Sequence, residues 1–430
     1  MRPNHFTLES ADAGHVRAVA EAMRALSEQP GDVSATVAGI LAGVREGGDE
    51  AVLELTRRFD GDVAELRVPP AALDEALAAL DPEVRLGLDT AVANVRQVAE
   101  LDAADDLAAR LPEGHTVTLR SLPVSRVGVY VPGGRAAYPS SVVMCCIPAR
   151  VAGVTEIAVA TPPGPEGRPS AVTLAACRLC GVEAVYAMGG AQAVAALAYG
   201  TAAVNPVDVI VGPGNAYVQE AKRQLAGLVG IDSVAGPTEL LVVADAGADP
   251  ALVALDLVAQ AEHGAESVVG IVSPDAALLE AVSEAALRLA AERPSVTEAP
   301  LALVRTPSIE AAMDVANEFA PEHLELACED AERLAGAVRA SGCVFIGAGA
   351  AFGDYAAGSN HVLPTGGAAR FSGPLGAATF RRRQALVSLP RAAAHALAPH
   401  VASVARAEGF PVHAESAEAR AGSAGEPDDA

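Results

Sequence analysis

Hydrophobic residues recur at spacings of three and four through the first quarter of the chain, which is the period of an amphipathic helix. Pro70 and Pro82 interrupt this pattern, because proline fixes one backbone angle and lacks the N–H group that a helix interior needs. The pattern therefore predicts helices over residues 33–44, 49–59, 71–80 and 82–101.

Short β-branched runs alternate with helical stretches from Val124 onward. The first run, Val127–Val131, leads into Pro132-Gly133-Gly134, as expected of a strand that ends in a turn. Further strands are expected at 156–160, 184–187 and 207–211, with helices at 142–151, 171–179, 191–198 and 216–225. In a second block the expected strands are 240–244, 267–272, 301–305 and 342–346, with helices between them.

Strands that alternate with helices form βαβ units around a parallel sheet. A chain of 430 residues is long enough for about two to four domains. The sequence therefore predicts an α/β protein with two Rossmann-like domains, in each of which helices flank a parallel sheet. Small helical extensions are expected at both ends, including a helix over 391–407, and the acidic end 421–430 is expected to be frayed.

Composition and charge exclude several classes of protein. Hydrophobic residues make up 51% of the chain and charged residues 20%, as in soluble globular proteins. The 30 basic and 54 acidic residues give a net charge of -24, which repels phosphate backbones and anionic membranes, so no nucleic-acid partner is expected. No apolar run of about 18 residues predicts a membrane span, and residues 1–15 lack the apolar core of a secretion signal.

Lysine and cysteine usage narrows the chemistry further. The single lysine, Lys222, lies in the polar run 219–223, interpreted as an exposed helix face, where an amine is poorly suited to Schiff-base chemistry. Six cysteines are too few for a disulfide framework in a chain of this length, which favours a reducing, cytoplasmic location. Cys177 and Cys180 have the spacing of a redox or zinc pair, but no second pair completes a zinc site, so both are interpreted as buried thiols.

Gln260 and His263 are the first candidate ligands. Asp249-Pro250 begins a predicted helix that runs to Gly264, because Asp is a good N-cap and Pro suits the first helical position. At a spacing of three the two side chains share a face of the last turn. They are either a pair of metal ligands or a structural pair, and a metal would need further ligands from elsewhere.

Two other segments contain acids beside histidines. Glu322-His323 follows Ala320-Pro321 and is predicted to lie in a connecting loop, where the pair could supply two proton acceptors to one cleft or form a simple surface pair. Asp354 and His361 lie in a glycine-rich loop after a predicted strand, a position where sites of α/β proteins are built.

Two glycine clusters each follow a predicted strand and open a helix, a geometry that suits a bound phosphate or nucleotide. They are Gly189-Gly190 and Gly212-Pro213-Gly214-Asn215. The run 347–353 only superficially resembles a dinucleotide fingerprint, because its spacing is off by one and no clear helix is predicted after it. Glu408 and His413 lie five residues apart across Pro411 and, taken alone, are interpreted as tail residues.

These separate patterns occur in the order found in one enzyme family, and the chain closely resembles L-histidinol dehydrogenases over roughly residues 30–415. Seven motifs carry the resemblance. They are Val129-Tyr130-Val131-Pro132-Gly133-Gly134, Gly189-Gly190-Ala191-Gln192-Ala193, Gly212-Pro213-Gly214-Asn215, Ala235-Gly236-Pro237-Thr238-Glu239, Gln260-Ala261-Glu262-His263-Gly264, Ala320-Pro321-Glu322-His323-Leu324-Glu325 and the loop 353–365.

The resemblance implies a zinc- and NAD-dependent enzyme that oxidises L-histidinol through L-histidinaldehyde to L-histidine with two NAD+. It implies Glu322 and His323 as the catalytic pair, and contacts to NAD from Tyr130, Gln192 and Asn215. The implied zinc ligands are Gln260, His263, Asp354 and His413. The implied substrate contacts are these four ligands together with Thr238, His323, His361 and Glu408.

The resemblance also implies a homodimer in which a C-terminal arm reaches the partner subunit, so that Glu408 and His413 complete the neighbouring site. The domain organisation expected from it has five parts. They are an N-terminal extension over 1–29, a discontinuous α/β domain over 30–128 and 238–380 with the zinc and catalytic residues, an inserted NAD-binding domain over 129–237, an arm over 381–420 and a disordered tail over 421–430.

Two departures from the family pattern bear on the choice of substrate. Thr238 stands where the family usually has serine, which keeps the hydroxyl group but adds a methyl group. The segment 347–352 is about two residues shorter than the family's loop and lacks its acid. The alternative is therefore a zinc- and NAD-dependent dehydrogenase of another small alcohol, such as a sulfonated diol.

Overall fold

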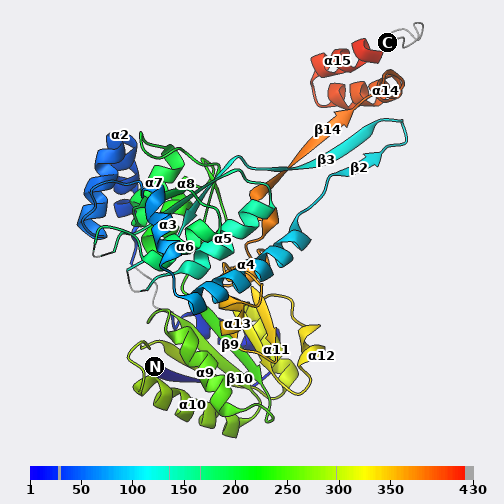
Figure 1. Ribbon diagram of the computed structural model, residues 1–430. Helices are drawn as coiled ribbons and strands as arrows, with labels where there is room; N and C mark the ends of the chain where they lie inside the picture. Colours follow the sequence, from blue (N-terminus) through cyan, green and yellow to red (C-terminus); the bar gives the residue numbers. More distant parts are fainter. Residues whose placement is uncertain (28–30, 135, 165, 297, 422–430) are drawn as a thin grey trace. The chain divides into compact units, whose positions relative to one another are not determined.

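The structure is a computed structural model that describes residues 1–27, 31–134, 136–164, 166–296 and 298–421. It comprises two compact units. The first contains Met1–Asp102 and Val124–Phe380, and the second contains Ala103–Pro123 and the chain from Arg381 onward. Both candidate sheets of the α/β prediction belong to the first unit (Figure 1).

A six-stranded parallel sheet forms one half of the first unit, in the order β1-β11-β10-β9-β12-β13. Its strands are β1 Arg2–Thr7, β9 Glu239–Ala244, β10 Val268–Ser273, β11 Pro300–Arg305, β12 His323–Ala327 and β13 Cys343–Ile346. Its helices are α1 Ala13–Arg24, α9 Pro250–Ala261, α10 Ala276–Ala291, α11 Ile309–Phe319, α12 Ala331–Ala335 and α13 Ala350–Tyr355. The predicted N-terminal helix is present, but an edge strand, β1, precedes it.

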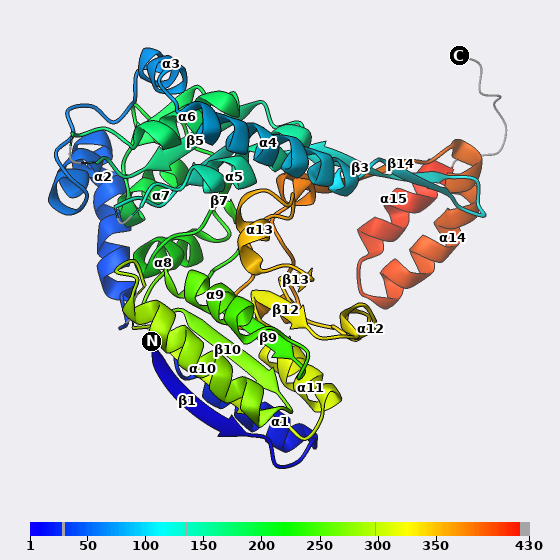
Figure 2. The same ribbon diagram turned by 60° about the horizontal axis from the view of Figure 1, so that its bottom comes forward.

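Both faces of this sheet are buried, because successive side chains of a strand point to opposite faces. On β9, Leu240 and Val242 pack with α9 and α10, whereas Leu241 and Val243 pack with α1 and α11. Figure 2 shows α9 and α10 side by side over one face. The central strands β9 and β12 are therefore held from both sides, which fixes the residues at their ends.

A five-stranded parallel sheet forms the other half, in the order β6-β5-β4-β7-β8. Its strands are β4 Arg126–Tyr130, β5 Glu156–Thr161, β6 Ala184–Ala187, β7 Val209–Val211 and β8 Gly230–Ile231. Its helices are α2 Ser34–Phe59, α3 Pro70–Ala78, α4 Pro82–Asp102, α5 Pro139–Val151, α6 Ala171–Leu179, α7 Gly190–Tyr199 and α8 Ala216–Leu225. The predicted break between the first two helices is a kink inside α2, where Gly48 has a φ of 54°.

The helices of residues 34–102 pack on this smaller sheet. Val37, Leu41 and Val52 of α2 share one buried cluster with residues of α7 and α8, and α3 and α4 contact α6 and α5. The expected domain over 30–128 and 238–380 grouped these helices with the larger sheet, whereas the structure packs them on the smaller sheet. The apolar stripe of a helix does not specify which sheet it will cover.

The second unit contains structure that the sequence pattern did not predict. Three antiparallel strands pair in the order β14-β3-β2; they are β2 Leu107–Arg110, β3 Thr116–Pro123 and β14 Arg381–Ser388. The helix expected over 391–407 is confirmed as α14 Arg391–Ala407, and α15 Pro411–Ala421 packs against it through Ala402, Ala405 and Ala414. Residues 422–430 of the predicted tail lie outside the described residues.

The interpretation of Lys222 as an exposed residue is wrong. Its side chain is fully buried, and Nζ lies 2.5 Å from Asp232 Oδ1 and 3.1 Å from the carbonyl oxygen of Gly212. The backbone N–H of Gly212 donates to Asp232 Oδ2 at 2.8 Å. Lys222 is one turn after Val218, on the packed face of α8. The buried Lys222–Asp232 ion pair therefore holds both the carbonyl oxygen and the N–H group of Gly212, the first residue of the Gly212–Asn215 loop.

The interpretation of Cys177 and Cys180 as buried thiols is confirmed, and both are free. Burial raises the pKa of Cys180 to about 12 and that of Cys177 well above its ordinary value, so both stay protonated and unreactive. Within the described part of the chain, no helix is long and apolar enough to cross a membrane.

Candidate active site

The candidate catalytic residues gather at the amino-terminal edge of the larger sheet. Thr238 precedes β9, Glu322 precedes β12, and His323 is the first residue of β12, which pairs directly with β9. The prediction that Glu322 and His323 lie in a connecting loop is therefore wrong for His323. Both side chains are buried, which excludes the simple surface pair.

The carboxylate of Glu322 is held in one position by two donors. Its Oε2 accepts hydrogen bonds from the Thr238 hydroxyl at 2.5 Å and from the backbone N–H of Glu239 at 2.9 Å. The Thr238 oxygen in turn accepts from Gln260 Nε2 at 2.5 Å. Thr238 thus bridges the end of α9 to the carboxylate of Glu322, and the hydroxyl group that it shares with serine makes both contacts.

The imidazole of His323 lies between backbone and carboxylates. Nδ1 lies 3.2 Å from the carbonyl oxygen of Glu239, and because a carbonyl only accepts hydrogen bonds, Nδ1 carries a proton. Nε2 lies 3.3 Å from Asp354 Oδ1, and the ring stacks on Phe345 with centroids 5.9 Å apart. The geometry leaves Nε2, on the Asp354 side, as the nitrogen that can gain or lose a proton.

Charges around His323 outweigh its burial. Burial alone would lower its pKa, but the negative charge of Glu322 and the Asp354 carboxylate, 3.3 Å from Nε2, raise it well above the ordinary value. Burial would raise the pKa of Asp354, but the hydrogen bond and charge of His323, with the charges of His361 and His263, lower it. The neighbouring carboxylates therefore make the neutral ring of His323 a stronger proton acceptor than a free imidazole.

Glu239 is a residue of this site that the sequence analysis did not single out. Its Oε2 accepts from the backbone N–H of Glu322 at 3.3 Å and its Oε1 from Gly366 at 3.1 Å. Burial and the nearby charge of Glu322 raise its pKa to about 8.

Ala320, two residues before Glu322, has a left-handed φ of 49°, a conformation that costs energy outside glycine.

The candidate metal ligands are only partly assembled. Gln260 is in the last turn of α9 as predicted, whereas His263 follows the Glu262 cap and is exposed. Asp354 lies in α13, a short helix that the sequence analysis did not predict after the glycine run. In the part of the chain that the structure describes, no three His, Cys, Asp or Glu side chains converge tightly enough to hold a metal.

The candidate cofactor residues lie at the carboxyl edge of the smaller sheet. The hydroxyl of Tyr130 accepts from the backbone N–H of Gly190 at 3.1 Å. Gln192 is buried and donates from Nε2 to Asp60 Oδ2 at 2.8 Å. Asn215 caps α8 by accepting from the backbone N–H groups of Tyr217 and Val218, so its N-cap position shapes the loop after β7.

The two edges meet at the loop that contains His361. Nε2 of His361 lies 3.4 Å from the hydroxyl oxygen of Ser141, near the start of α5, and Nδ1 lies 2.8 Å from the carbonyl oxygen of Asp354. Nearby, Asn360 donates from Nδ2 to the carbonyl oxygen of Met144 at 2.7 Å. The amino edge of the larger sheet, which bears the acids and histidines, is therefore joined to the carboxyl edge of the smaller sheet.

Glu408 and His413 belong to the second unit. Glu408 is the C-cap of α14, and His413 lies in α15, where its ring contacts that of Phe410 at a centroid distance of 5.5 Å. Both residues are exposed.

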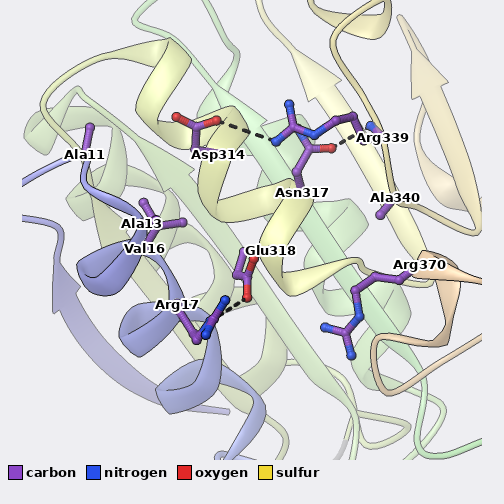
Figure 3. Close-up of a pocket in the computed structure, with 10 residues that line it drawn as sticks. All are labelled: Ala11, Ala13, Val16, Arg17, Asp314, Asn317, Glu318, Arg339, Ala340 and Arg370. Carbon is purple, nitrogen blue, oxygen red and sulfur yellow. Dashed lines mark hydrogen bonds and ion pairs between the residues drawn. The ribbon is translucent and has the colours of Figure 1, made fainter.

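A cavity of about 450 Å³ lies elsewhere on the first unit, between α1, α11 and the segment around Arg370 (Figure 3). Its acids are already paired: Glu318 with Arg17 at 3.3 Å and Asp314 with Arg339 at 3.8 Å. It has no histidine and none of the candidate site residues described above.

The arrangement defines an α/β enzyme in which two parallel sheets meet at a site with paired acids and histidines. Comparison with known proteins identifies the family: the histidinol dehydrogenase model matches residues 23–421. The chain belongs to the histidinol dehydrogenase family.

Similar proteins carry the same name over nearly the whole chain. The histidinol dehydrogenase of Thermobifida fusca is 47% identical, covering 88% of this chain and 89% of its own. That of Pseudomonas savastanoi is 42% identical, covering 96% and 95%. The crystal structure of the enzyme from Elizabethkingia anophelis superposes with a TM-score of 0.89 at 29% identity, over 98% of each chain.

The Thr238 hydroxyl provides a direct test of the hydrogen-bond network. Thr238→Val keeps the shape but removes the hydroxyl, leaving Gln260 Nε2 and Glu322 Oε2 without this partner. We expect the free energy of unfolding to fall by about 1–3 kcal/mol, measured by urea denaturation. Thr238→Ser is the matched control and should stay within about 1 kcal/mol of wild type. Equal losses in the two variants would contradict the bridging role.

Proposed function

We propose that this protein oxidises L-histidinol to L-histidine through L-histidinaldehyde with two NAD+, the last steps of histidine biosynthesis. Membership of the histidinol dehydrogenase family, with relatives 42–47% identical, supports the substrate. The observation that carries the mechanism is the buried contact of His323 with Glu322 on one side and Asp354 on the other.

His323 acts as the general base of the first oxidation. Its Nδ1 is committed to the carbonyl oxygen of Glu239, so Nε2 takes the alcohol proton. Glu322 and Asp354 stabilise the imidazolium that forms, because opposite charges in a buried site favour the protonated ring. Phe345 stacks on the ring and limits its rotation.

Glu322 acts in the second oxidation, in which the aldehyde must add water. A carboxylate held by Thr238 and Glu239 is fixed in orientation, so it can accept a proton from a water molecule as that water attacks the aldehyde carbon. The His323 imidazolium left by the first oxidation gives its proton to the aldehyde oxygen as water adds, so the neutral ring can then take a proton from the hydrated aldehyde as the second hydride leaves. NAD+ supplies the hydride acceptor in both oxidations when it is bound.

Tyr130, Gln192 and Asn215 are proposed to contact NAD at the carboxyl edge of the smaller sheet. The Tyr130 hydroxyl accepts a hydrogen bond from the backbone N–H of Gly190, and Gln192 donates one to Asp60. Asn215 caps the start of α8. Helix N-termini with free N–H groups favour phosphate groups. Ser141, on the helix that follows β4, contacts His361.

Gln260, His263, Asp354 and His413 are proposed to hold zinc. Two imidazoles, a carboxylate and an amide oxygen suit this ion, and the lowered pKa of Asp354, which His263 helps to lower, keeps its carboxylate available as a ligand. Bound zinc would supply a Lewis-acid anchor for the substrate. In this chain, Thr238 already positions Gln260 at the site, and His361 and Glu408 are proposed as further substrate contacts.

The C-terminal arm, residues 381–420, is proposed to reach the partner subunit of a homodimer. Within this arm most of β14 is exposed, including Leu386 and Val387, and so are Phe410 and Val412. All four residues of β2, a strand of the same unit, are exposed as well. An apolar surface of this kind marks a protein interface. The arm would then bring Glu408 and His413 to the neighbouring site.

The remaining finer assignments follow from the same proposal. Free cysteines and a biosynthetic role favour a cytoplasmic location. The alternative substrate, a sulfonated diol, is not favoured, because the relatives named here are all histidinol dehydrogenases.

Replacement of the base tests the mechanism. His323→Asn should lower kcat for histidinol oxidation by about 10²–10⁴-fold, measured by NADH formation, while the bound zinc content stays at the wild-type level. His5→Asn, at an exposed position on β1, is the matched control and should leave kcat unchanged. Near-normal turnover of His323→Asn would rule out His323 as the base.

Mixed dimers test the arm exchange. His323→Asn and His413→Asn homodimers should each be inactive. If arms cross, each heterodimer has one site with both histidines, so a fully exchanged equal mixture should recover about a quarter of wild-type activity. If each arm serves its own chain, both sites of every heterodimer are defective, and the mixture stays inactive.

A further inference from the structure

The smaller sheet has the connectivity of a dinucleotide-binding sheet. Its chain runs from β4 outward to β5 and β6, then returns to the other side of β4 as β7 and β8. In such sheets a dinucleotide lies across the carboxyl ends at the point where the order reverses, and an acid after the second strand binds the 2′-hydroxyl of the adenosine ribose.

The second strand of this sheet lacks that acid. β5 ends at Thr161 and is followed by Pro162-Pro163, whose side chains offer no oxygen to a ribose. The usual source of selectivity between a ribose hydroxyl and a ribose phosphate is therefore absent from the end of β5.

Asp60 supplies a carboxylate at this place from a distant part of the chain. It is the C-cap of α2, and a Cβ atom built on Gly189 would lie 2.7 Å from both Asp60 Oδ1 and Pro162 Cγ. The Asp60 carboxylate thus lies where the loops after β5 and β6 meet. Gly189 leaves the space that the carboxylate occupies.

Asp60 is held by donors rather than by a counter-ion. Gln192 Nε2 donates to its Oδ2 at 2.8 Å, and the backbone N–H of Gly189 also donates to the carboxylate. Among the described residues no lysine or arginine forms an ion pair with Asp60; Arg57 is paired instead with Asp62. Partial burial raises the pKa of Asp60 to about 6, with the two donors opposing the rise, so it is ionised above pH 7.

An ionised carboxylate without a counter-ion distinguishes the two nicotinamide dinucleotides. The 2′-hydroxyl of NAD can donate a hydrogen bond to it, which is stronger than one between neutral groups. The 2′-phosphate of NADP would place like charges together in a partly buried site, where screening is weak.

We propose that Asp60, oriented by Gln192, accepts a hydrogen bond from the adenosine ribose 2′-hydroxyl and makes the protein select NAD over NADP. This inference rests on the proposed use of NAD and assigns a specificity-determining residue to that site.

Direct binding of NADH and NADPH tests the inference, with nicotinamide fluorescence as the readout and no substrate present. Wild type should bind NADH at least about tenfold more tightly than NADPH. Asp60→Asn should lower that ratio by about 10–100-fold, through weaker NADH binding and tighter NADPH binding. Asp62→Asn is the matched control, because Asp62 lies two residues away with a side chain that is 99% exposed, and it should keep the wild-type ratio.

The outcomes separate this inference from the proposed function. Equal binding of the two dinucleotides by wild type, or binding of neither, would overturn it even if Asp60→Asn did not fold. Equal weakening of both by Asp60→Asn would also overturn it and make Asp60 merely structural. Preferential NADH binding that Asp60→Asn abolishes, without histidinol oxidation by wild type, would uphold the selectivity and refute the proposed function alone.

Discussion

The pairing of β9 with β12 in the middle of the larger sheet is the constraint on which the site depends. His323 is in register with Leu240, so the residues before the two strands, Thr238 and Glu322, come within hydrogen-bond distance of each other. Both strands are buried on both faces and cannot slip without exposing apolar side chains. Glu239 reinforces the junction by binding the backbone of Glu322 from the neighbouring strand.

This site lies at the amino-terminal edge of its sheet, whereas ligands of open α/β sheets usually bind beyond the carboxyl ends. The smaller sheet follows the usual rule, with Tyr130 and the two glycine turns at its carboxyl edge. His361 and Ser141 join the two edges, so under the proposed function the two sheets have separate tasks. The larger sheet would handle protons, and the smaller one would hold the dinucleotide at the same junction.

Much of the fold followed from hydrophobic period. Strands such as Glu156–Thr161 and helices such as Ala171–Leu179 are continuous in pattern and were predicted within one or two residues. β12 was missed because its five residues include His323 and Glu325, and a strand with two titratable side chains resembles a loop. Lys222 was misjudged because a buried lysine is recognisable only with its partner Asp232, ten residues on.

The residues of the candidate site also fall into those that the sequence predicted and those that it did not. The resemblance of the motifs singled out six residues that contact one another in the structure: Thr238, Gln260, Glu322, His323, Asp354 and His361. Glu239 and Asp60 escaped notice because their partners are Gly366 and Gln192, over 120 residues away in sequence. No local pattern reports a contact at that separation.

The proposed reaction is a four-electron oxidation at one site that needs both zinc and NAD. The most direct measurement is the number of NADH molecules formed per L-histidinol consumed by zinc-reconstituted protein, with a chelator-treated sample and a zinc-restored sample beside it. We expect two NADH per histidinol, loss of turnover on chelation and recovery with zinc. One NADH per histidinol, or full turnover after the metal is removed, would contradict it.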